Sequence, residues 1–260
     1  MSCKIRIVNY KESFKIVNEN NGKLEQICIV TEKWGEELDN DVYQKIKKNN
    51  DYFYQFLEQL IQILQILSEN RIIHRELTPQ NFRIQFVEQN LYLKLISFGV
   101  SKQIDITKRN QGTSDVGSIN YMASEVIEGI KYGFDVDVYT VGVLLLGILL
   151  GESWQYFNFG YNLQSKQLLL KEMKDSILEA QENLKKNREY EDWVYELVSQ
   201  MIEFNSIDKF NEQKQKENPK IKTRINIYKI LDMQQFQHLK KKEHFYQYDE
   251  EKNNKFKCEY

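Results

Sequence analysis

The sequence predicts an α+β fold that is mostly α-helical, and three patterns favour this class. First, residues 5–14 and 23–34 are rich in β-branched and aromatic side chains and flank the turn-forming stretch N-E-N-N-G, which predicts a β-hairpin. Second, apolar residues recur at i, i+3, i+4 and i+7 between residues 52 and 68, the pattern of a helix that faces a core. Third, the apolar run 138–150 has about 13 residues, which suits a fully buried helix and is too short for a membrane span.

Later segments extend this prediction. Residues 91–96 alternate as a short strand, and residues 168–184 and 193–202 have the apolar spacing of amphipathic helices. The stretch from about 206 to 223 is rich in Lys, Asn and Gln, which is typical of a surface insertion. Beyond residue 236 the chain is strongly charged, so we expect residues 237–260 to form a tail outside the folded domain.

Composition limits the classes of partner. The chain of 260 residues is 41% apolar with a net charge of −2, so it can bury one good core and has no basic excess for nucleic acid. Its cysteines, Cys3, Cys28 and Cys258, are widely spaced, which argues against a disulfide framework or a zinc site. The N-terminus lacks the apolar core of a signal peptide. We therefore expect a cytoplasmic protein that binds neither nucleic acid nor membranes.

Two short motifs carry the functional signal. The first is H-R-E-L-T-P-Q-N, residues 74–81, and the second is S-F-G, residues 97–99, which directly follows the predicted strand. The pair resembles the catalytic loop H-R-D-L-x-x-x-N and the metal-binding loop D-F-G of eukaryotic protein kinases, serine/threonine kinases in particular. The positions that match this frame are His74, Arg75, Leu77, Pro79, Asn81, Phe98 and Gly99.

Further matches to the kinase family follow. Residues 117–126, G-S-I-N-Y-M-A-S-E-V, resemble the end of an activation segment, with Ser124 in place of a proline. The resemblance implies that Glu125 pairs with Arg224 and that Asp137, at the start of the buried helix, holds the backbone of the His74 loop. It also implies that His74, Phe98 and Tyr10 stack in a spine between the two lobes. The activation segment contains Thr107, Thr113, Ser114 and Ser118, and a phosphate on one of them could order the loop through Arg75.

The groups that perform kinase chemistry are altered. Glu76 stands at the position of the catalytic aspartate, and Ser97 at that of the magnesium-binding aspartate, which leaves Asn81 as the other metal position. Mg²⁺ is normally held through one or two carboxylates, which a neutral hydroxyl does not replace. Thr78 stands where serine/threonine kinases have a lysine. Arg83 stands where the family has an apolar residue under the adenine, so we expect this guanidinium either to need a partner or to reduce the affinity for a purine.

The N-terminal lobe is reduced in this register. Residues 5–14 and 23–34 resemble the fourth and fifth strands of a kinase, so Thr31 would be the gatekeeper and Glu32 to Trp34 the hinge that contacts a nucleotide. No Gly-rich phosphate loop occurs in the sequence, and no room is left before Met1 for it or for the N-lobe lysine. The predicted domain is thus residues 1–236, with remnant N-lobe strands and hinge at 1–35 and a C-lobe at 36–236.

The sequence favours a pseudokinase, a catalytically impaired kinase-like domain that binds or scaffolds an unidentified protein partner, with no cofactor expected. A first alternative is a weakly active serine/threonine kinase that uses Mg-ATP and retains Glu76 as base. A second is a fragment of a longer kinase whose start is not Met1. A third is a decaying gene product without a selected role.

Overall fold

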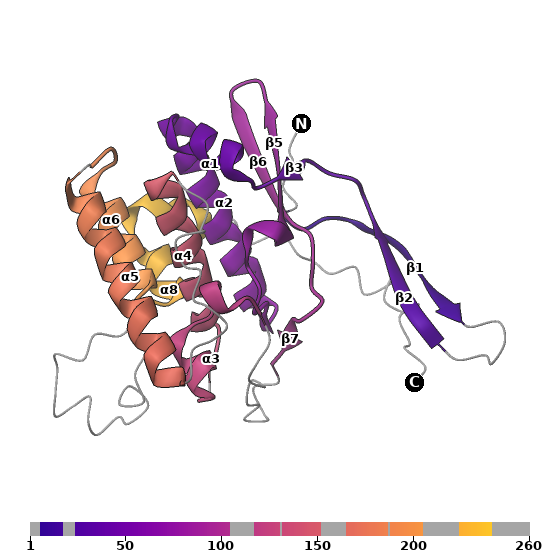
Figure 1. Ribbon diagram of the computed structural model, residues 1–260. Coiled ribbons are helices and arrows are strands. Elements are labelled where there is room, and N and C mark those ends of the chain that lie inside the picture. Colours follow the sequence, from indigo (N-terminus) through magenta and orange to yellow (C-terminus); the bar gives the residue numbers. More distant parts are fainter. Residues whose placement is uncertain are drawn as a thin grey trace.

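The computed structural model describes residues 6–17, 24–104, 117–130, 132–151, 165–186, 188–204 and 224–240. The helices pack into one body, and a two-stranded hairpin extends away from it (Figure 1). The strands are β1 (Tyr10–Val17), β2 (Leu24–Thr31), β3 (Glu36–Glu37), β4 (Ile72–Ile73), β5 (Phe82–Val87), β6 (Asn90–Leu95) and β7 (Lys102–Gln103). The α-helices are α1 (Asn40–Lys47), α2 (Asn50–Glu69), α3 (Ser124–Glu128), α4 (Asp135–Leu150), α5 (Lys166–Lys186), α6 (Asp192–Met201), α8 (Ile227–Asp232) and α9 (Gln237–Lys240). The predicted class, mostly α with small antiparallel sheets, is confirmed.

The hairpin is formed by β1 and β2 in antiparallel register, with Phe14 opposite Cys28. The predicted first strand began earlier, at residue 5, and the structure divides that segment. Residues 6–8 instead run parallel to β6, where the Val8 N–H donates to the Leu95 carbonyl (3.0 Å) and the Leu95 N–H to the Arg6 carbonyl (2.8 Å). The N-terminal segment therefore anchors the hairpin to the helical body.

The core is built on α2 and α4. All seven apolar residues that predicted α2, Phe53, Phe56, Leu57, Leu60, Ile61, Leu64 and Leu67, are buried. On α4 every residue from Val136 to Leu149 is buried, as the continuous apolar run predicted. Gly142 lets α6 approach, because a Cβ there would lie 2.7 Å from the Cβ of Met201. These two helices form the support on which the loops of the site rest.

A second sheet, in the order β3-β5-β6, lies against α2. The buried amide of Gln59 on α2 donates to the Leu91 carbonyl (2.8 Å) and accepts from the Leu93 N–H (2.7 Å). Arg6 donates to the same amide oxygen (2.6 Å), so one side chain joins helix, strand and N-terminal segment. This arrangement fixes the strands that carry the predicted site.

The domain boundaries stay a prediction in part. The insertion at about 206–223 lies outside the described residues. At the predicted start of the tail, residues 237–240 form α9, whose Leu239 is buried against the core, so the folded part extends beyond residue 236. Residues 241–260 lie outside the described part. Among the described helices, none is long and apolar enough to cross a membrane.

Candidate functional site

The loop that begins at His74 is held by a carboxylate from α4. Asp137 is buried, and its two oxygens accept the backbone N–H groups of His74 (2.7 Å) and Arg75 (2.9 Å). Burial raises the pKa of Asp137 to about 6, against the opposing effect of these two N–H donors. Arg75 has a left-handed backbone, φ +69°, which the two hydrogen bonds sustain. The first turn of the buried helix thereby sets the shape of the loop.

His74 connects this loop to the S-F-G segment. Its ring lies edge to face against Phe98, with centroids 5.1 Å apart, and its Nε2 contacts the Ser97 carbonyl. Burial lowers the pKa of His74 to about 4, so the imidazole is neutral at pH 7. With Nδ1 accepting from the Glu76 N–H (3.3 Å), the proton resides on Nε2. Tyr10, the third predicted member of the stack, lies at the start of β1 and is 47% exposed, which does not fit a buried spine.

The structure brings the altered catalytic positions together. The Asn81 amide donates to the Glu76 carbonyl (2.8 Å) and to the Glu76 carboxylate (3.2 Å). The Asn81 carbonyl accepts the N–H of Ile96 (2.9 Å), which places Asn81 beside Ser97 at the ends of β5 and β6. The Ser97 hydroxyl accepts only a long bond from the Gly99 N–H (3.5 Å). Thr78 is buried and supplies no charge.

The sheet next to this loop has a charged surface. Arg83 on β5 lies directly opposite Lys94 on β6, so both side chains are on one face. The Arg83 guanidinium binds the carboxylate of Glu37 (2.9 Å), which supplies the partner that the sequence required without naming it. It also donates to the carbonyls of Gln80 (3.0 Å) and Phe82 (2.8 Å). Two opposed cations therefore cover the face where an apolar residue was expected.

The predicted hinge provides the acid for the second cation. Glu32 forms an ion pair with Lys94, whose side chain is only 5% exposed, and this hydrogen bond lowers the pKa of Glu32. The Lys94 Nζ also lies 4.9 Å from the ring centre of Trp34. Thr31 ends β2 and its hydroxyl contacts the Glu32 carbonyl (3.4 Å). Of the three residues named from the sequence, Glu32 and Trp34 thus contact Lys94 of this sheet, whereas Thr31 belongs to the hairpin.

A second charged pair lies behind the loop. The Arg224 guanidinium binds both carboxylate oxygens of Glu125 (2.5 and 3.1 Å), and both side chains are fully buried. Arg224 also donates to the carbonyls of Glu203 and Asp135, each at 3.0 Å. The Ser124 hydroxyl, in place of the family's proline, donates to the same carboxylate (3.2 Å). The pair joins α3 to the start of the last helices.

A family model described as the protein kinase domain matches residues 3–221. The chain belongs to the protein kinase family. Among curated proteins, this kinase chain is 32% identical over 148 residues to the carbon catabolite-derepressing protein kinase of Candida tropicalis, covering 56% of the chain and 23% of that relative. It is 34% identical over 126 residues to the SNF1-like protein kinase ssp2 of Schizosaccharomyces pombe, covering 48% and 21%.

A third relative is the inhibitor of nuclear factor kappa-B kinase subunit beta of Bos taurus, 39% identical over 95 residues that cover 36% of this chain and 12% of the relative. The kinase chain thus spans less than a quarter of the length of these curated relatives.

Arg75 of the loop has two further close contacts. Arg75 donates to the Val100 carbonyl (2.5 Å), and Gly117, with φ +114°, passes so close to the Arg75 carbonyl that a Cβ would lie 2.7 Å from it. Ser118 follows this contact. Thr107, Thr113 and Ser114 lie outside the described residues.

Sequence reasoning missed Lys94 and Glu37. A signal for Lys94 was present, because it is the one charged residue in L-Y-L-K-L, a strand that the buried helix α2 covers. Its partner Glu32 is 62 residues away, and no strand pairing relates the two, because β2 and β6 belong to different sheets.

Proposed function

We propose that this kinase-family domain is impaired in phosphate transfer and acts as a binding or scaffolding module, a pseudokinase. The observation that supports the proposal is the residue at the position of the metal-binding aspartate: Ser97 supplies only a hydroxyl there, beside Asn81, the metal position that matches the family. Mg²⁺ is bound through anionic oxygens at short distance with near-octahedral geometry. Asn81 is a ligand that the kinase frame uses, but the neutral hydroxyl of Ser97 does not replace the carboxylate that this ion needs.

The carboxylate that remains is already engaged. One oxygen of Glu76 accepts the Asn81 amide, so the base position and the metal position bind each other. Among the described residues, no group of three or more His, Cys, Asp or Glu is placed to hold a metal ion. Glu76 is also one methylene longer than aspartate, and a misplacement on the order of 1 Å can cost about a hundredfold in rate.

The nucleotide surface supports the same proposal. Four charged groups lie on the sheet face and hinge that a purine would contact: Arg83, Lys94, Glu37 and Glu32. A purine seated there would have to displace these ion pairs or desolvate them, and buried charge without a partner is costly. We therefore expect weak or absent ATP binding, with Mg-ATP relevant only to the enzyme alternative.

The hairpin supports a binding role. Phe14, Ile27 and Ile29 are 50–68% exposed, and four more large apolar residues of this hairpin are also exposed. Apolar surface concentrated on one element is typical of protein interaction sites. A protein that covers this hairpin is the partner class that we propose, and the hairpin's own chemistry does not identify it further.

The alternative of a weakly active kinase is favoured by one specific observation, the intact loop backbone with an acid at Glu76. A chain that continues before Met1 would be compatible with the short coverage of the relatives. An in-frame phosphate loop with its lysine in the transcript upstream of Met1 would support that alternative. It would leave Ser97 and Thr78 unchanged.

The deciding experiment is a thermal shift with and without nucleotide and metal, followed by transfer of radiolabelled phosphate with Mg²⁺ or Mn²⁺. A ligand at a hundred times its Kd stabilises the folded state by about 2.7 kcal/mol, a shift of several degrees, whereas we expect a shift below about 1 °C at millimolar Mg-ATP. Phosphate transfer that Glu76→Ala abolishes, and that the exposed control Glu69→Ala leaves unchanged, would establish the enzyme alternative.

A further inference from the structure

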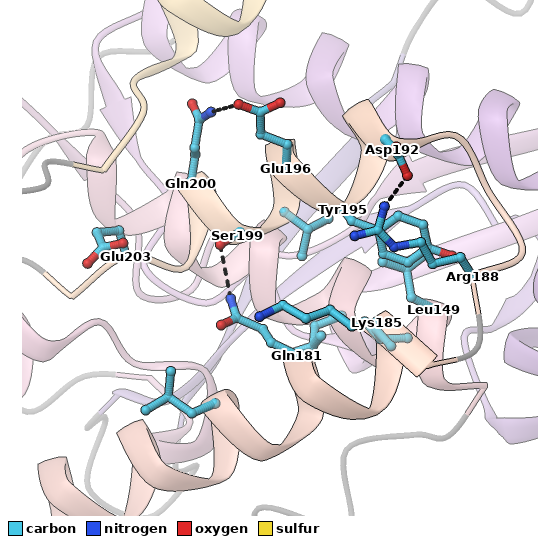
Figure 2. A pocket seen from close by; sticks show the side chains of 14 residues that line it. Leu149, Gln181, Lys185, Arg188, Asp192, Tyr195, Glu196, Ser199, Gln200 and Glu203 are labelled. Carbon is cyan, nitrogen blue, oxygen red and sulfur yellow. Dashed lines mark hydrogen bonds and ion pairs between the residues drawn. The ribbon is translucent and has the colours of Figure 1, made fainter.

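Side chains of α5 and α6 line most of a groove. The two helices lie on the side of the helical body away from the β1–β2 hairpin (Figure 1). The volume of the groove is about 880 Å³, and its floor includes Leu146 and Leu149 of α4. Figure 2 shows the two helices side by side, with Gln181 of α5 reaching Ser199 of α6 at 3.2 Å. At one end Arg188 forms an ion pair with Asp192, the first residue of α6. The described residues that line the groove include none of the candidate catalytic residues.

The α5 wall is basic. Positions three and four apart lie on one helix face, and one such face of α5 has two features: an exposed leucine, Leu178, and lysines on either side of it. Its members are Lys171, Lys174, Leu178, Gln181 and Lys185. The acids of α5 are not among the residues that line the groove, and of the three lysines Lys185 is the one that lines it. No ion pair with an acid of the described residues engages these three lysines.

The α6 wall is acidic. Glu196 and Glu203 line the groove on this side, and Glu196 accepts a bond from Gln200 (3.3 Å). Both walls are helices, and the backbone groups within a helix bond to one another. A helix satisfies its own backbone groups internally and presents one apolar ridge with a charged flank on each side, which matches these two walls.

We propose that this groove binds an amphipathic α-helix of a protein partner. The helix has an apolar ridge that covers Leu178, which is 48% exposed, a glutamate or aspartate toward Lys185, and a lysine or arginine toward Glu196 and Glu203. Charge complementarity fixes which flank of the helix faces α5 and thus its orientation. The proposal does not depend on loss of catalysis, because an active kinase with the same α5 and α6 would bind the same helix.

The probe is a fluorescein-labelled helical peptide of about 15 residues with leucines along one face, glutamates on one flank and lysines on the other. Fluorescence anisotropy with the full chain is expected to show saturable binding. Leu178→Glu removes the apolar contact at an exposed position and should weaken binding at least tenfold, since burial of one leucine is worth about that factor. Lys185→Glu should weaken it several-fold, and Lys186→Glu, the same change on the same helix outside the groove, should leave it unchanged.

A second peptide tests the orientation. It has the flanking glutamate and lysine positions exchanged on the same leucine face, and it should bind Lys185→Glu better than it binds the wild-type chain. Circular dichroism of each variant establishes that the fold is retained. Absence of saturable binding to the wild-type chain, or equal binding by wild type, Leu178→Glu and Lys185→Glu, would overturn the proposal, whatever the outcome of the nucleotide experiments.

Discussion

Replacement of Glu125 by glutamine tests the buried ion pair that joins α3 to the C-terminal helices. The change leaves the Arg224 guanidinium in a site where both side chains are at most 1% exposed, with one charge uncompensated. Removal of one partner from such a pair costs about 3–5 kcal/mol. For a domain of this size that corresponds to a fall in Tm of about 6–20 °C. The loss would consume a large share of a total stability of about 5–15 kcal/mol.

The assay is urea unfolding followed by circular dichroism on Glu125→Gln, Arg224→Met and the double variant. The double variant removes both charges, so the cost should fall short of the sum of the single costs by about 2 kcal/mol or more. The matched control is Asp192→Asn, which breaks an exposed pair with Arg188 and should cost about 1 kcal/mol or less. Additive single costs, or a Glu125→Gln cost no larger than that of Asp192→Asn, would refute the reasoning.

Three further predictions concern the core, the loop and the hinge. Gly142→Ala places a Cβ 2.7 Å from Met201 and 2.8 Å from Ile202, so urea unfolding should show a loss of about 1–3 kcal/mol, whereas Gly133→Ala, with no atom within 4 Å, should not show a packing cost. His74 has its pKa lowered from 6.5 to about 4, so its stabilisation is complete above pH 6.5 and is lost as pH falls toward 4. Measured against His74→Phe in unfolding titrations, the free energy of unfolding of the wild type should rise by about 3 kcal/mol between pH 4 and 7. A difference between the two that does not change with pH would contradict the buried neutral imidazole. Asp137, raised from 3.8 to about 6, contributes the opposite slope, so the wild type alone should change less than this difference. Lys94→Met leaves Glu32 without its cation and should speed proteolysis in the segment between β2 and α1; unchanged cleavage would show that the ion pair does not fix the hinge.

Local pattern was sufficient for the helices and for the catalytic frame. The spacing that predicted α2 and the apolar run that predicted α4 both report burial, which depends on a residue's own segment and face. The positions of His74, Asn81 and Ser97 followed from motifs of fixed spacing. The structure places these residues within one connected loop network.

Long-range pairing was predictable only in part. The need of Arg83 for a partner followed from the cost of a desolvated guanidinium, but Glu37 could be identified only from the pairing of β3 with β5. The boundary of β1 was misplaced because residues 6–8 are as strand-like as the hairpin, and their partner, β6, lies more than 80 residues away. The exposure of Tyr10 depends on which other segments pack against the hairpin, and the alternation of residues within a strand does not predict those segments.

The two ends of the hairpin are tied to one strand of the body. Residues 6–8 form backbone hydrogen bonds with Leu95 of β6. Glu32, which follows β2, forms an ion pair with Lys94, the residue before Leu95 on the same strand. Two residues farther along is Ser97, whose carbonyl contacts His74. A protein that grips the exposed strands and pulls on them would therefore apply its load at a single point next to the catalytic loop. Force applied to the hairpin would therefore be transmitted to β6 first and, through it, to the contact between Ser97 and His74.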